Sequence, residues 1–174
     1  MNSILARWHT LAAEEAVGEV LSCCGSAAWA RKLTAMRPFA NEQKLFAAAD
    51  ECWQRLPPSG WLEAFRSHPR IGEQHAQNKT TATSAAWSKS EQSQMKDADA
   101  AILMRMREGH RDYEERFGRI FIVCASQKQP AELLSILERR LNNDPAEELL
   151  ESAAQQQQIM QLRLRKWLAG TGAA

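Results

Sequence analysis

Apolar residues recur at a helical spacing along almost the whole chain. Over residues 11–23 they fall about 3.6 positions apart, and Gly25 follows where a helix would end. Over residues 145–168 the same spacing follows Asp144 and Pro145, a pair typical of a helix start. This period gathers the side chains on one face of a helix and does not suit a strand. The sequence therefore predicts an all-α fold, with further helices over 26–36, 42–55 and 130–141.

One apolar run interrupts this pattern. Residues 120–125 read Ile-Phe-Ile-Val-Cys-Ala and have the length and β-branching of a buried strand, but the sequence holds no second candidate strand. We interpret the run as a buried extended segment or as the start of another helix. The 174 residues suit one domain, 1–174, and can bury a core. We expect a single-domain multi-helix bundle with short loops and one long central helix.

The long central helix is expected over residues 88–117, behind a polar loop. Residues 74–86 are small and polar, which is typical of a mobile surface loop that can cover a site. Ser88 and Glu91 then have the spacing of a capping box, which favours a helix start at Ser88. Glu91 would lie in the first turn, where free N–H groups attract anions. A capping role alone also explains Glu91.

Charge and composition argue against several classes of partner. With 22 basic and 21 acidic residues the net charge is +1, so no global field favours nucleic acid or an anionic membrane. The N-terminus lacks the pattern of an export signal, and no window approaches the ~20 apolar residues of a membrane span. We therefore expect a cytoplasmic protein. Free, buried thiols are expected at four positions that lack Cys-x-x-Cys spacing, namely Cys23, Cys24, Cys52 and Cys124.

The stretch Ser67-His68-Pro69 is the first candidate for chemistry. Proline disfavours the α region for the residue before it, so His68 should lie where a helix has just ended. Its imidazole has an ordinary pKa near neutrality, which suits proton transfer in either direction. A helix-ending turn with a purely structural histidine explains the stretch equally well.

Arg163 is the second candidate. It is three residues from Met160 and four from both Ile159 and Trp167, so it should lie against the apolar stripe of the last helix. A buried guanidinium group needs an anionic or carbonyl partner, because an unpaired buried charge costs several kcal/mol. Its fork geometry suits a carboxylate or a ureido-type oxygen pair. A structural ion pair would satisfy the same requirement.

No metal or cofactor is expected from the sequence. The four histidines show neither His-x-x-x-His nor Glu-x-x-His spacing, and the cysteines are scattered. A glycine-rich phosphate loop and a nucleophile-elbow serine are also missing, which argues against nucleotide binding and serine-based hydrolysis.

Six sequence fragments follow one another along the chain. They are Trp29 with Arg37-Pro38-Phe39; Phe65-Arg66-Ser67-His68-Pro69; Ser88-x-x-Glu91-Gln92; Tyr113 with Arg116-Phe117-Gly118 and Phe121-Ile122; Leu137-x-x-Arg140-Leu141-x-Asn143-Asp144; and Ile159 with Arg163-Leu164. In this order the chain resembles the OHCU decarboxylase family, named for 2-oxo-4-hydroxy-4-carboxy-5-ureidoimidazoline. Two stretches depart from the usual family pattern, Arg70-Ile71-Gly72 and Arg119-Ile120.

The resemblance implies a homodimeric, cofactor-free lyase of urate degradation that converts OHCU to (S)-allantoin and carbon dioxide. It implies that His68 is the general acid and base, that Glu91 is its partner or a substrate ligand, and that Arg163 holds a carbonyl or carboxylate oxygen. The resemblance also implies five substrate-binding residues: Pro69, Ser88, Gln92, Phe121 and Ile122. Two alternatives remain open, a non-enzymatic helical interaction module and a hydrolase of a related ureido compound.

Overall fold

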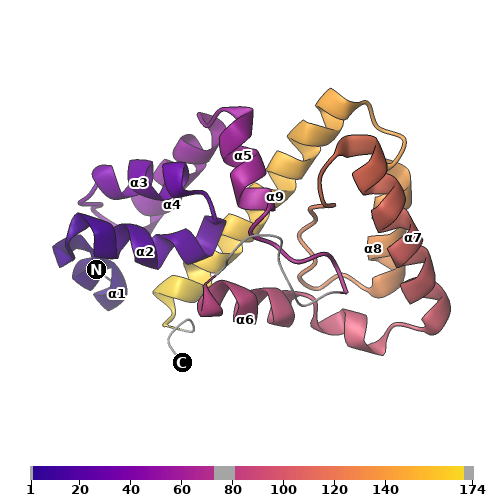
Figure 1. Cartoon of the computed structure of the whole chain (residues 1–174). Helices are drawn as coiled ribbons and strands as arrows, with labels where there is room; N and C mark the ends of the chain where they lie inside the picture. The colour runs from indigo at the N-terminus through magenta and orange to yellow at the C-terminus, as the bar shows by residue number, and fades with distance from the viewer. Residues whose placement is uncertain (1, 73–80, 171–174) are drawn as a thin grey trace. The chain divides into compact units, whose positions relative to one another are not determined.

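The computed structural model describes residues 2–72 and 81–170, and all regular structure in these two ranges is helical (Figure 1). The predicted all-α fold is therefore confirmed. By its internal contacts the chain divides into two compact units: unit 1 comprises Met1–Ala64 and Gln157–Ala174, and unit 2 comprises Phe65–Gln156. The expectation of a single functional domain over 1–174 stays a prediction. No described helix is both long enough and apolar enough to cross a membrane.

Unit 1 contains the first helices and the second half of the last one. These are α1 (Ser3–Thr10), α2 (Ala13–Cys24), α3 (Ala27–Ala35), α4 (Glu42–Gln54), most of α5 (Pro58–Phe65) and the C-terminal half of α9 (Pro145–Leu168). Three predicted boundaries are confirmed: Gly25 ends α2 in the left-handed region with φ 81°, and the side chains of Ser26 and Asn41 cap α3 and α4.

Helix α1 was not expected from the apolar spacing. The side chain of Asn2 caps it by accepting from the N–H groups of Ile4 at 2.9 Å and Leu5 at 3.3 Å. The fully buried indole of Trp8 donates to the Ala16 carbonyl at 2.9 Å. This short helix is stabilised by its cap and by the packing of Trp8, and it has too few buried residues to show a helical period of apolar positions in the sequence.

Unit 2 contains the middle helices and the first half of α9. These are α6 (Ala82–Glu91), the 3₁₀ helix η1 (Ser93–Asp97), α7 (Ala100–Phe117), α8 (Pro130–Arg140) and the N-terminal half of α9. The side chain of Asp144 precedes α9 and accepts from the Ala146 N–H at 2.9 Å, as the Asp-Pro pair predicted. With 24 residues, α9 is the longest described helix.

The single long helix predicted over residues 88–117 is wrong. Two helices and a 3₁₀ turn occupy this region, because Thr81 caps α6 and Asp99 caps α7 through its side chain. The extended backbone of Ala98, with ψ 137°, separates them. Ser88 therefore lies inside α6, near its C-terminal end, and cannot form a capping box.

The predicted polar loop over residues 74–86 is also wrong in part. Residues 82–86 form the first turns of α6, and the Thr81 hydroxyl accepts from the Ser84 N–H at 3.0 Å. Residues 74–80 lie outside the described residues. The cluster of threonines thus contains a helix cap, which the small polar composition concealed.

The apolar run over residues 120–125 forms neither a helix nor a strand, and each of its residues is at most 6% exposed. The predicted burial is confirmed, and the alternative that the run starts another helix is wrong, since α8 begins only at Pro130. The run packs into a core made by Tyr113, Leu137 and their neighbours. Helices α7 and α8 flank this core, and they approach closely at Gly109, where a Cβ atom would lie 2.8 Å from Cδ2 of Leu137.

Candidate active site

His68 lies in the turn that follows α5, as the His-Pro sequence predicted. Its backbone N–H donates to the carbonyl of Phe65, the last residue of α5, at 3.1 Å. The residue is 6% exposed, and Pro69 follows it directly. Because proline restricts the backbone on both sides of the His-Pro bond, the imidazole is attached to a stiff corner.

Each of the three residues 70–72, which follow this corner, contacts another residue of unit 2. Arg70 forms an ion pair with Glu114 of α7, with its Nη2 2.9 Å from Oε2. The Ile71 carbonyl oxygen lies 3.2 Å from Nε2 of His110, one helical turn from Glu114 on the same helix. These contacts fix the segment that begins at Pro69 against α7.

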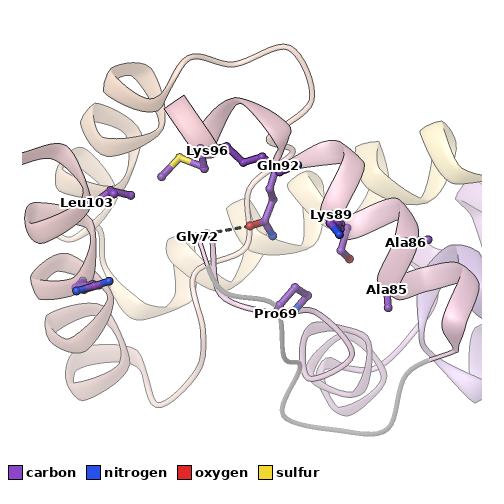
Figure 2. Close-up of a pocket in the computed structure, with 11 residues that line it drawn as sticks. Pro69, Gly72, Ala85, Ala86, Lys89, Gln92, Lys96 and Leu103 are labelled. Carbon is purple, nitrogen blue, oxygen red and sulfur yellow. Dashed lines mark hydrogen bonds between the residues drawn. The ribbon is translucent and has the colours of Figure 1, made fainter. Parts of the chain in front are cut away.

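The third contact closes the turn. Gly72 has φ 86°, and its N–H donates to Oε1 of Gln92 at 2.9 Å (Figure 2). Gln92, the residue that follows α6, thereby ties the turn to that helix. We call the segment Pro69–Gly72 the clamped turn, since its residues 70 to 72 are held by Glu114, His110 and Gln92.

The Arg70 contact also sets the charge state of Glu114. The hydrogen bond from Arg70 lowers the pKa of this carboxyl group, and the positive charges of Arg70 and His110 act in the same direction, although partial burial opposes them. Glu114 is therefore ionised at neutral pH and keeps the ion pair intact.

A cavity of about 500 Å³ adjoins the clamped turn. Pro69 and Gly72 line one side of it, and Lys89 and Gln92 line the side where α6 ends (Figure 2). Ser88 of α6 also lines the cavity. Residues of η1 and α7 complete the wall: Met95, Lys96, Leu103 and Arg107. This volume lies within the range of small-molecule sites. Of the five residues expected to bind substrate, Pro69, Ser88 and Gln92 thus line one cavity.

Glu91 is the last residue of α6 and is partly exposed. The expectation that it lies in the first turn of a helix is wrong, so the attraction of anions by free N–H groups does not apply there. A carboxylate in the last turn instead lies at the negative end of the helix dipole. Its role beside His68 stays a prediction.

Phe121 and Ile122 lie in the buried segment 120–125. The Phe121 ring packs edge-on against Tyr113 at a centroid distance of 5.3 Å. The Ile122 carbonyl oxygen accepts from Nη1 of Arg140 at 2.7 Å, and Arg140 also pairs with Glu148. Both members of this ion pair are fully buried.

The buried ion pair belongs to a hydrogen-bond network inside unit 2. Burial raises the pKa of Glu148, but hydrogen bonds from Arg140, Tyr113 and Asn143 and the charge of Arg140 outweigh it, so the pKa is lowered. Burial and the bond to Glu148 raise the pKa of Tyr113 to about 12. The side chain of Glu148 is thus a carboxylate, and the neutral phenol of Tyr113 donates a hydrogen bond to it.

Arg163 faces inward on α9, as its position on the apolar stripe predicted, and it is fully buried. Its Nη1 approaches the carbonyl oxygen of Ser22 at 3.5 Å. Burial raises the pKa of the Cys23 thiol, and the charge of Arg163 opposes that rise, which marks the two side chains as neighbours. Arg163 belongs to unit 1 and His68 to unit 2, so their meeting in one pocket stays a prediction.

The clamp residues were missed by the sequence reasoning. His110 and Glu114 are four residues apart and therefore share a helix face, which is a detectable signal. A second detectable signal is the charged residue Arg70 directly after the His-Pro pair. Among the described residues, no three His, Cys, Asp or Glu side chains gather as a metal ion would require.

Comparisons with known proteins agree with the motif order. The family model of OHCU decarboxylase matches residues 9–165. The uric acid degradation bifunctional protein TTL of Arabidopsis thaliana is 34% identical over 83% of this chain. The matched region is 44% of that protein, so the chain spans less than half its length.

Two further relatives are matched over most of their length. The 2-oxo-4-hydroxy-4-carboxy-5-ureidoimidazoline decarboxylase of Amia calva is 33% identical over 87% of this chain and 85% of its own. A crystal structure of OHCU decarboxylase in the presence of (S)-allantoin superposes with a TM-score of 0.74, at 33% identity, and covers 87% of this chain and 97% of that one. The sequence and the fold lead to the same conclusion: the chain belongs to the OHCU decarboxylase family.

Proposed function

We propose that the protein decarboxylates OHCU to (S)-allantoin and carbon dioxide in urate degradation, without a cofactor. The observation that carries this proposal is the family match over residues 9–165, which contains the candidate residues His68, Glu91 and Arg163. The cavity beside the clamped turn supports it, because it offers a small-molecule site lined by Pro69, the residue that follows His68 in sequence.

The chemistry of the substrate explains why no external electron sink is needed. The departing carboxylate is attached to a ring carbon that neighbours a C=N bond. When the carbon–carbon bond breaks, its electron pair forms a new C=C bond and the C=N electrons move onto nitrogen, which takes up a proton. The resulting enol loses its hydroxyl proton, and a proton added to one face of the carbon that bears the ureido group gives (S)-allantoin. The protein must therefore position the ring and deliver one proton stereoselectively.

His68 is the proton carrier in this scheme. A buried imidazole on a stiff corner presents its ring nitrogens in a defined direction, which a one-sided protonation requires. Glu91 orients that imidazole or accepts from the substrate hydroxyl or ureido N–H. Arg163 donates to a carbonyl or carboxylate oxygen of the substrate, a role that suits its fork geometry.

Five residues bind the flat, polar ring: Pro69, Ser88, Gln92, Phe121 and Ile122. The common cavity of Pro69, Ser88 and Gln92 supports this assignment. Oε1 of Gln92 is engaged by Gly72, so its amide NH₂ is the group with which it would bind an acceptor on the substrate. Phe121 and Ile122 do not line this cavity among its described residues, and their assignment rests on the family resemblance.

We also propose that the protein acts as a homodimer in the cytoplasm. The family resemblance supports the dimer, and the four free, buried cysteines suit a reducing compartment. Light scattering after size-exclusion chromatography at micromolar concentration tests the dimer, and a monomer mass across that range would contradict it.

The test of the reaction is to mix the purified protein with freshly generated OHCU and follow circular dichroism. We expect a faster and larger signal of (S)-allantoin than in buffer alone. Hydrolysis products without allantoin would instead support a hydrolase of a ureido compound. A signal identical to the spontaneous decay would support a non-enzymatic interaction module.

A further inference from the structure

We propose that Lys89, Lys96 and Arg107 form a cationic entrance that captures the anionic substrate and discriminates it from the neutral product. This inference rests on the proposed function and concerns residues outside the sequence motifs. We call these three side chains the cationic entrance. They come from three helices, α6, η1 and α7, and line the same cavity of about 500 Å³.

The charge of the cavity wall has one sign. None of its described lining residues is a carboxylate, whereas three of them are cations. Figure 2 shows Lys89 and Lys96 on the α6 and η1 side of the cavity, across from Pro69. The whole chain has a net charge of only +1, so this grouping is a local excess and does not reflect the composition.

Among the described residues, the three cations differ from their neighbours in forming no ion pair with a carboxylate. On α7, Arg105 pairs with Glu138 and Arg111 contacts Asp112 at 3.2 Å. Arg107 lies between them in sequence and forms no ion pair with a described residue, and the same holds for Lys89 and Lys96. Within the described residues, their charge is therefore not neutralised by an ion pair.

A concave wall of one sign concentrates counter-charged ligands near it. Each exposed cation is expected to favour binding of a carboxylate about two- to fivefold at low salt, in line with surface ion pairs. Salt screens this attraction over about 8–10 Å at physiological ionic strength. Capture at the entrance should therefore weaken as salt rises.

The reaction itself explains why cations belong at the entrance. The substrate carries a carboxylate, whereas (S)-allantoin is neutral, so a cationic wall attracts the first and does not hold the second. The cationic entrance shares its cavity with Pro69, the residue that follows His68 in sequence, and with Ser88 and Gln92, so the charge that attracts the substrate lies in the cavity of three proposed substrate-binding residues.

Two hydantoin ligands test the inference without turnover. Hydantoin-5-acetate is an anion and 5-methylhydantoin is its neutral counterpart, and their dissociation constants are measured by calorimetry at 20 and 300 mM salt. We expect the wild-type protein to prefer the anion at low salt and to lose most of that preference at high salt. The variant Arg107→Gln should reduce the preference about two- to fivefold, and Lys89→Gln/Lys96→Gln/Arg107→Gln should abolish it.

Kinetics with OHCU give the second measurement. In the triple variant we expect KM to rise about tenfold or more at low salt, kcat to change less than twofold, and inhibition by (S)-allantoin to stay the same. Arg111→Gln is the matched control, since it removes one positive charge from the same helix outside the cavity and should leave all these values unchanged.

Three results would overturn the inference. They are equal affinities for the two ligands in the wild type, an anion preference that the triple variant keeps, and a loss that Arg111→Gln reproduces. Failure of the proposed function looks different: the protein would prefer the anion in calorimetry and yet produce no (S)-allantoin from OHCU.

Discussion

Nη1 of Arg140 donates a hydrogen bond of 2.7 Å to the carbonyl oxygen of Ile122, inside a segment that has no neighbouring strand among the described residues. Buried backbone groups need partners, and in this segment side chains supply them. The Cys124 N–H donates to Gln155 at 3.0 Å, and its carbonyl accepts from Lys128 at 2.9 Å. Backbone groups of residues 120–125 are thus satisfied by side chains from α8, from α9 and from Lys128 in the connecting loop.

Glu148→Gln should strongly destabilise the protein. The change removes the nearer counter-charge of the fully buried Arg140 and leaves only Glu151 at 3.9 Å among the described carboxylates; breaking a buried pair in this way costs about 3–5 kcal/mol. Urea unfolding followed by circular dichroism gives the free energy of unfolding. The control Glu138→Gln breaks the exposed pair with Arg105 and should cost less than about 1 kcal/mol. Equal losses for the two variants would show that burial does not decide the strength of these pairs.

Acid should remove the contribution of Glu148. Its pKa is lowered below the ordinary value of 4.5 because hydrogen bonds and the charge of Arg140 outweigh burial. A lowered carboxyl pKa stabilises the folded state fully above the unfolded-state pKa, and this contribution is lost as pH falls through the folded-state value. Between pH 7 and pH 3 the unfolding free energy should therefore fall more in the wild type than in Glu148→Gln. Parallel curves for the two proteins would contradict this assignment.

Gly72→Ala should loosen the clamped turn. Gly72 has φ 86°, and an alanine held in this left-handed conformation is strained by about 1–2 kcal/mol. There is room for the added Cβ atom itself, since it would lie 3.9 Å from Cε of Met95. We expect a lower free energy of unfolding and a slower reaction, since the turn directly follows His68. The control Gly18→Ala lies in α2 with no atom within 4 Å and should stabilise by up to about 1 kcal/mol. The same sign for both variants would refute the conformational argument.

His68→Asn should keep the fold and lose the reaction. Asparagine preserves much of the size and polarity of the side chain but cannot exchange a proton near neutral pH, so we expect at least about a 100-fold loss of kcat. Far-ultraviolet circular dichroism of the variant should match the wild type. Stereoselective (S)-allantoin production at the wild-type rate would remove His68 from the mechanism.

Arg163→Lys should weaken substrate binding, because lysine cannot donate two parallel hydrogen bonds. We expect a clear rise in KM for OHCU, measured together with the melting temperature to detect a packing defect. The matched change Arg165→Lys affects an exposed residue of the same helix and should alter neither value. If Arg163→Lys lowers only the melting temperature, the arginine is structural.

Local signals predicted most of the helices correctly, whereas one local signal misled. Asn41 and Gly25 mark true helix ends because capping is decided within a few residues. Ser88 and Glu91 have capping-box spacing as well, yet Thr81 and Asp99 are the actual caps. A spacing of three residues recurs often by chance, whereas the break between α6 and α7 consists of the 3₁₀ helix η1 and the extended backbone at Ala98.

The candidate site was predictable to the extent that it depends on neighbours in sequence. The corner at His68 follows from Pro69, and the inward direction of Arg163 follows from helical spacing. By contrast, Arg70 and Glu114 are 44 positions apart, and no periodic pattern connects them. The cationic entrance likewise exists only once three helices surround one cavity.

Gly109 lies where α7 packs against α8, directly before the residue that contacts the clamped turn. The missing side chain lets Leu137 pack against the α7 backbone, and His110, the next residue, reaches the Ile71 carbonyl. A Cβ atom at position 109 would lie 2.8 Å from Cδ2 of Leu137, so the Leu137 side chain would have to move. Two adjacent residues of α7 thus carry two different duties: Gly109 gives room to α8, and His110 contacts a turn nearly forty residues earlier in the chain.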